Sequence, residues 1–106
     1  MKKADKLRLR LELIEERGWV CEFTGKPLSG FHLHHGIIGD CKALRDVLHC
    51  KENLFIVDPN INISRVLDNQ EQRDKFWGVQ VERYGEDRMR GFIDSVNEQV
   101  KIPYKF

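Results

Sequence analysis

Two histidines and two asparagines near the middle of the chain are the residues best suited to chemistry. His34 and His35 are adjacent, at the end of the segment 31–35. One neutral imidazole can bind a divalent metal, while the other, with an ordinary pKa near neutrality, can take a proton from an attacking water. The amide oxygen of Asn62 can bind the same metal, and the side chain of Asn53 can hold a loop by hydrogen bonds to its backbone. The same residues are also compatible with a polar strand end, caps and turns.

Apolar periodicity and turn residues predict the elements that must position these side chains. In chain order we expect a helix over about 4–17, a short strand or knuckle at 19–21, a strand over 31–35, a short helix around 42–48, a strand over 53–57, a helix over about 60–67, and helices over about 70–84 and 86–100. Adjacent strand residues point to opposite faces, so His34 and His35 meet at one site only where the strand ends or twists. The first helix should bury Leu7, Leu11 and Ile14, with Leu9 and Leu13 broadening its apolar face.

The order and spacing of these residues resemble the HNH endonuclease family. The resemblance covers about residues 7–67 and rests on three stretches: Arg17-Gly18-Trp19-Val20-Cys21-Glu22-Phe23-Thr24-Gly25-Lys26-Pro27-Leu28, Leu33-His34-His35-Gly36-Ile37, and Glu52-Asn53-Leu54-Phe55-Ile56-Val57. In the family, an acid or His followed by His ends the first strand, an Asn opens the second, and a His or Asn follows nine residues later. Asn53 and Asn62 have this spacing.

The resemblance implies an α+β fold with a small, treble-clef-like ββα-metal core over about 19–67. An N-terminal helix would precede this core and C-terminal helices over about 70–100 would follow it, so that 1–106 forms a single HNH-like nuclease domain. It also implies a metal-dependent DNA endonuclease, a phosphodiester hydrolase that uses a His general base and one divalent cation. Small free-standing members of the family are common in phages and mobile elements.

The resemblance also assigns roles to the four central residues. His35 corresponds to the general base that deprotonates the attacking water, and Asn53 to the residue that orients the loop carrying His35. His34 and Asn62 correspond to the protein ligands of the divalent cation. An amide oxygen at position 62, where many relatives have His, is a harder and weaker ligand, and it favours Mg²⁺ or Mn²⁺ over Zn²⁺ or Ni²⁺.

The second departure from the family concerns a structural zinc. Many relatives hold this zinc with two Cys-x-x-Cys pairs, whose positions here carry Cys21, Thr24, Asp58 and Ile61. Since three of the four ligands are missing, we predict no structural zinc, and we expect helix packing to stabilise the fold instead.

Charge is nearly balanced over the whole chain but not along it. Lys+Arg 18 against Asp+Glu 17 gives a net charge of +1, which excludes a polybasic, histone-like protein. The first ten residues have one acid, Asp5, and five cations: Lys2, Lys3, Lys6, Arg8 and Arg10. These cations and His32 are candidates for contacts with phosphates or DNA. The alternatives are a solvated, partly frayed helix start and a half-exposed strand histidine.

Sequence also predicts the compartment and the partners. No apolar run approaches the roughly 18 residues that a membrane span needs, and the N-terminus lacks the apolar centre of a signal peptide. Three cysteines are an odd number and few for a disulfide-rich secreted fold. We therefore expect an intracellular, cytoplasmic protein with DNA as its partner, no membrane association, and a monomeric or homodimeric state.

Other residues and other functions stay open at this stage. Asn60 could replace Asn62 as a ligand, and Asp40 or Asp58 could add a carboxylate near the metal. Cys41, His49 and Cys50 could form a zinc cluster with His32, but their spacing matches no metal knuckle, and we expect ordinary buried or unused thiols. The alternative functions are a nucleic-acid-binding module that does not cleave and a protein-interaction domain with neither activity.

Overall fold

The protein is mostly helical around a small two-stranded sheet. The computed structural model describes residues 2–39, 41–64, 67 and 69–105, and of residues 62–64 it describes the backbone alone. Its elements are α1 (Lys3–Arg17), β1 (His32–His35), the 3-10 helix η1 (Lys42–Leu44), α2 (Arg45–Leu48), β2 (Leu54–Val57), α3 (Pro59–Ser64), α4 (Gln70–Tyr84) and α5 (Glu86–Asn97). Their order and approximate bounds agree with the expectation from sequence, and the fold class is α+β.

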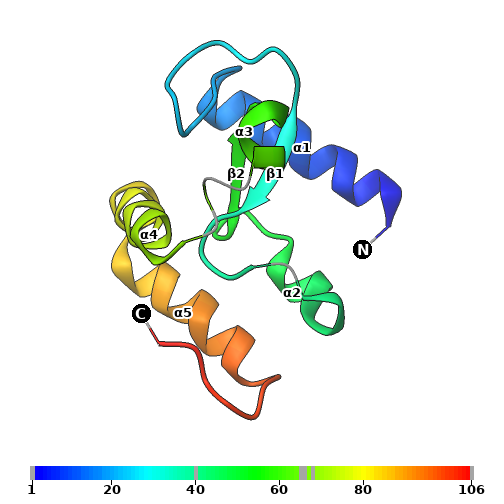
Figure 1. Ribbon diagram of the computed structural model, residues 1–106. Helices are drawn as coiled ribbons and strands as arrows, with labels where there is room; N and C mark the ends of the chain where they lie inside the picture. The colour runs from blue at the N-terminus through cyan, green and yellow to red at the C-terminus, as the bar shows by residue number, and fades with distance from the viewer. Residues whose placement is uncertain (1, 40, 65–66, 68, 106) are drawn as a thin grey trace.

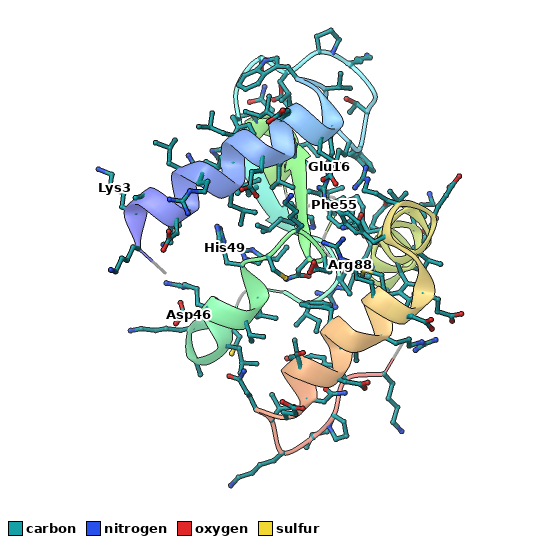
Figure 2. All side chains as sticks on the ribbon, turned by 180° about the vertical axis from the view of Figure 1, so that it is seen from behind. Lys3, Glu16, Asp46, His49, Phe55 and Arg88 are labelled. Atoms are coloured by element: carbon teal, nitrogen blue, oxygen red, sulfur yellow. The ribbon has the colours of Figure 1, made fainter. Side chains whose placement is uncertain are left out.

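The sheet is an antiparallel pair, β1 with β2, in which His32 lies opposite Val57 and His35 opposite Leu54. All four residues of β2 are fully buried, so both faces of the sheet are covered. Figures 1 and 2 show α3 over one face and α1 over the other. Alternation along β1 places His34 on one face and His35 on the face nearer α1.

The first helix ends where the sequence predicts, but it buries only part of the predicted apolar face. Gly18, with φ 86°, follows the last residue of α1, and its N–H donates to the carbonyl of Ile14. Leu13 is fully buried, whereas Leu7 and Leu11 are each 58% exposed. The expectation that Leu7 and Leu11 face the core is therefore wrong. Leucines lie around most of this helix, so periodicity alone does not select the face that packs.

The two C-terminal helices pack against one another and against the end of the sheet (Figure 1). Gly85, with φ 90°, separates α4 from α5 and allows the sharp reversal between them. Phe76 of α4 is buried, and its ring centroid lies 4.1 Å from that of Phe55 on β2. The C-terminal helices thus support the strand that leads to α3. No helix in the described part of the chain is long and apolar enough to cross a membrane.

Candidate active site

The two adjacent histidines have different neighbours, as their opposite faces require. His34 is 8% exposed, and its ring centroid lies 5.7 Å from that of Phe76. His35, the last residue of β1, is half-buried, and its ring centroid lies 6.0 Å from that of His49. The structure therefore places the proposed ligand and the proposed base at the same strand end but on different sides of it.

Asn53 holds the loop that follows His35. The side chain is fully buried, and its Oδ1 accepts hydrogen bonds from the backbone N–H groups of Ile37 and Ile38, at 3.1 and 2.8 Å. Its Nδ2 donates to the carbonyls of Ile38 and Leu48, at 3.0 and 2.9 Å. All four hydrogen-bonding positions of the amide are thus used, and they fix the backbone immediately after the two histidines.

Gly36 belongs to the stretch that carries the resemblance, but sequence reasoning gave it no role of its own at this strand end. Its N–H donates to the carbonyl of Asn53 at 2.9 Å, which closes the loop onto the start of β2. A Cβ atom at this position would lie 2.5 Å from the ring of Phe55 and 3.0 Å from that of Phe76. Only glycine fits between the strand end and these rings, so the residue next to His35 has little freedom to change.

The helix with the second proposed ligand lies directly after β2. Helix α3 begins at Pro59 and packs against β1, and Asn62 lies within it. The side chain of Asn62 falls outside the described residues, so its role as a ligand stays a prediction. Asp40 also falls outside them.

Asp58 has a structural role at the start of α3. Its Oδ2 accepts from the hydroxyl and the backbone N–H of Ser29, at 2.5 and 3.0 Å, and its Oδ1 accepts from the N–H of Asn60 at 3.1 Å. The Ser29 hydroxyl, followed by the N–H groups of Ser29 and Asn60, holds the pKa of this carboxyl below its usual range, and His32 adds a smaller effect. Asp58 therefore caps α3 and fixes the 29–30 turn.

The expected positions of the zinc knuckle form a hydrogen-bonded turn. Cys21 is buried, and its Sγ accepts a hydrogen bond from the backbone N–H of Asp58 at 3.4 Å. Thr24 Oγ1 accepts from the N–H of Lys26 at 3.3 Å. Two of the four knuckle positions, 21 and 58, are therefore in direct contact, and a hydrogen bond joins them.

No group of three or more His, Cys, Asp or Glu side chains is arranged to hold a metal among the residues whose placement is described. Burial raises the pKa of the Cys50 thiol to about 12, so this group stays protonated and is a poor ligand. Of the two predicted ligands, the structure describes the side chain of His34 alone, and the amide of Asn62 stays a predicted donor. A set of one imidazole and one amide fits a hard cation such as Mg²⁺ or Mn²⁺, which keeps most of its water ligands.

A buried ion network, which the sequence did not suggest, ties α1 to β2 and α4. The side chain of Arg17 is 2% exposed, and its guanidinium donates to the carbonyls of Leu54 and Lys51, at 2.6 and 3.0 Å. Glu22 accepts from Arg17 and from Arg83, at 3.1 and 2.8 Å. A carboxylate oxygen of Glu22 also accepts from the N–H of Ile56 at 2.6 Å. This network fixes both residues that flank the 52–53 segment, and hence the base of the Asn53 loop.

His49 is the second residue near His35 that sequence reasoning did not place in the site. Its Nε2 is buried and has no hydrogen-bond partner among the described residues. Burial lowers the pKa of His49, and the nearby His35, Lys6 and Arg10 lower it further by electrostatic repulsion. Figure 2 shows His49 between α1 and α2. No sequence signal indicated this pairing, because it depends on how the 36–52 connection folds.

The candidate phosphate contacts separate into different groups. Lys3, Lys6 and Arg10 line one open pocket on α1. Arg8 instead pairs with Asp5 at 3.7 Å. Two further candidates lie apart: Lys2 precedes the first turn of α1 and is exposed, and half-buried His32 lies near Asp58.

Comparisons with models of protein families, with curated proteins and with solved structures find no match to this chain.

Proposed function

We propose that this protein is a metal-dependent DNA endonuclease of the HNH type, which hydrolyses phosphodiester bonds with His35 as general base. The observation that carries the proposal is the buried Asn53 amide, whose four hydrogen bonds hold the backbone directly after His34 and His35. A fully satisfied buried polar group of this kind fixes one loop conformation. Reactions that depend on the placement of a base need such a fixed loop.

The order of the elements supports the same proposal. The histidine pair ends β1, Asn53 precedes β2, and α3 follows β2 and packs against β1. This order brings Asn62, nine residues after Asn53, onto the helix next to the strand that carries the histidines. The alternative interpretation is a polar strand end with asparagine caps. It would not by itself require a histidine pair at the end of β1, Asn53 before β2 and α3 against β1 together.

In the proposed reaction, His35 takes a proton from a water molecule as the water oxygen attacks the phosphorus atom. The bond between phosphorus and the leaving oxygen then breaks, which gives one phosphate-bearing end and one hydroxyl end. His34 and Asn62 would hold the divalent cation. When bound, this cation supplies neutralisation of the charge that builds on the phosphate and the leaving oxygen. Asn53 and Gly36 keep the backbone of His35 in place.

The test is the nicking of supercoiled plasmid by purified protein in Mg²⁺ or Mn²⁺, with EDTA as the metal-free control. His35→Ala should lower the rate by about 10²–10⁴-fold, because a positioned general base contributes about that much. Glu98→Ala, an exposed change after the end of α5, should leave the rate unchanged. Thermal melting of each variant checks that the fold is intact.

Two results would contradict the proposal. Cleavage that persists at the wild-type rate in His35→Ala would exclude this residue as the base. Salt-sensitive DNA binding without cleavage in any divalent metal would favour the non-cleaving nucleic-acid-binding module instead.

A further inference from the structure

One face of α1 carries cations in a row. Lys3, Lys6 and Arg10 follow one another at helical spacings of three and four residues, which places them on the same side of the helix. Together with Ala4 and Leu7 they line an open pocket of about 620 Å³, which we call the basic pocket. Figure 2 shows Lys3 near the free end of α1, with α2 on the other side of the gap.

Within the described part of the chain, the cations of the basic pocket form no salt bridge. None of the salt bridges between described residues includes Lys3, Lys6 or Arg10. The guanidinium of Arg10 lies over the ring of Phe31, 5.5 Å from its centroid, which keeps that cation directed along the helix surface. An anionic ligand would therefore find three cations and, on the α1 side, no competing carboxylate.

The basic pocket continues toward the proposed general base. Lys6 and Arg10 are close enough to His49 to repel its protonated form. His49 in turn lies with its ring centroid 6.0 Å from that of His35. The cations of α1 are thus near His49, which in turn lies beside His35 at the end of β1.

We propose that the basic pocket binds the phosphates of one strand of duplex DNA, next to the phosphodiester that His35 attacks; this rests on the proposed endonuclease function. With a rise of 1.5 Å per residue, the seven steps from Lys3 to Arg10 span about 10 Å. One DNA strand advances about 3.4 Å along the duplex axis per phosphate, so a row of this length is long enough to contact more than one phosphate. A row of three cations of this length fits a polyanion better than a small free anion.

The structure also identifies an opposing charge. Asp46 of α2 lies close enough to Lys6 for an electrostatic interaction, and Figure 2 shows it across the gap from α1. A bound phosphate would compete with this carboxylate for Lys6. Removal of the Asp46 charge should therefore strengthen DNA binding, whereas removal of Lys6 and Arg10 should weaken it.

The experiment measures binding of the full chain to a fluorescent DNA duplex in EDTA, where no cleavage interferes. Lys6→Gln combined with Arg10→Gln should weaken binding about tenfold at low salt and lower the slope of log affinity against log salt by about two. The loss should be the same on two duplexes of unrelated sequence. Asp46→Asn should tighten binding about twofold to threefold, because it removes one repulsive charge near the phosphates.

The matched control combines Arg90→Gln with Lys75→Gln, which removes one arginine and one lysine that already pair with acids, Glu86 and Glu71. This control should bind within about twofold of wild type, and melting curves should show that all variants fold. Three results would each overturn the proposal that the basic pocket binds duplex DNA. These are equal losses of affinity in the two double variants, tighter binding to an RNA hairpin than to the duplex, and no DNA binding by the wild type. Plasmid nicking is scored separately, so a nuclease that binds DNA elsewhere is distinguished from a protein that is no nuclease.

Discussion

At the scale of single residues, the strand end at 34–36 is fixed by what its neighbours permit. Asn53 satisfies the backbone after His35, and Gly36 leaves room for the rings of Phe55 and Phe76. The sequence indicated Asn53, because its spacing from Asn62 is part of the resemblance. It gave no reason for the glycine at position 36, because the need for glycine there comes from two rings that are distant in the chain.

Gly36→Ala should destabilise the protein and displace the proposed base. The added Cβ would lie 2.5 Å from the buried ring of Phe55, so either this ring or the end of β1 must shift. Overpacking of this kind costs about 1–3 kcal/mol. Gly91→Ala is the control. Gly91 is an exposed residue of α5 with open space around it, so this substitution should stabilise the protein by about 0.5–1 kcal/mol. Urea unfolding measures the free energy of unfolding of both variants. If Gly36→Ala and Gly91→Ala change it in the same direction, this account of Gly36 is wrong.

At the scale of elements, the Arg17–Glu22–Arg83 network joins α1, the loop around residue 22 and α4. Glu22 precedes the turn at 24–27, Arg17 ends α1, and Arg83 lies near the end of α4. These charges also bind backbone atoms of Leu54 and Ile56, so they fix β2 as well as each other. This network does for the loop around residue 22 part of what a metal knuckle would do.

Glu22→Gln should be far more harmful than a similar change on the surface. Removal of its charge leaves Arg17, 2% exposed, with Glu16 at 3.4 Å as its remaining described carboxylate partner, and breaking a buried pair costs about 3–5 kcal/mol. The amide keeps one acceptor oxygen, so we expect a loss near about 2–3 kcal/mol in urea unfolding. Glu86→Gln removes an exposed partner of Arg90 and should cost less than about 0.5 kcal/mol. Similar losses in the two variants would show that the network does not stabilise the fold.

Elements with a strong local signal could be predicted from the sequence. The apolar run at 54–57 forms β2, and the helix boundaries at Gly18 and Gly85 follow from glycines with positive φ. The face of α1 could not be predicted, because leucines surround that helix. The network could not be predicted either, since Glu22 and Arg83 are 61 residues apart and charged residues are usually assigned to the surface.

The candidate site was predictable to the extent that it depends on local order. The histidine pair, Asn53 and the helix carrying Asn62 lie in consecutive elements, so spacing alone relates them. His49 belongs to no such pattern. It reaches His35 only because η1 and α2 turn the 36–52 connection back toward β1, and that path depends on the hydrogen bond from Asn53 to the carbonyl of Leu48.

At the scale of the whole molecule, the net charge is only +1, but positive charge is distributed unevenly. Lys6 and Arg10 of α1 lie close enough to His49 to affect its pKa. Burial lowers the pKa of His49 below its ordinary value of 6.5, and His35, Lys6 and Arg10 add repulsion. As pH falls, the unfolded chain therefore gains the His49 proton before the folded chain does. Stability must then decrease as pH falls through about 6.5 and continue to decrease until the lower folded-state pKa is passed.

The predicted loss of stability at lower pH can be measured as the melting temperature between about pH 7 and pH 5. The melting temperature of wild type should fall over this range, and His49→Asn should show a smaller fall because it removes the titrating group. Lys6→Gln with Arg10→Gln should also reduce the fall, since it removes two of the charges that repel protonated His49. Parallel profiles for wild type and His49→Asn would mean that His49 has no depressed pKa. A smaller fall in both variants would instead show that α1 and the histidines at the strand end share one electrostatic field, as phosphate binding beside His35 requires.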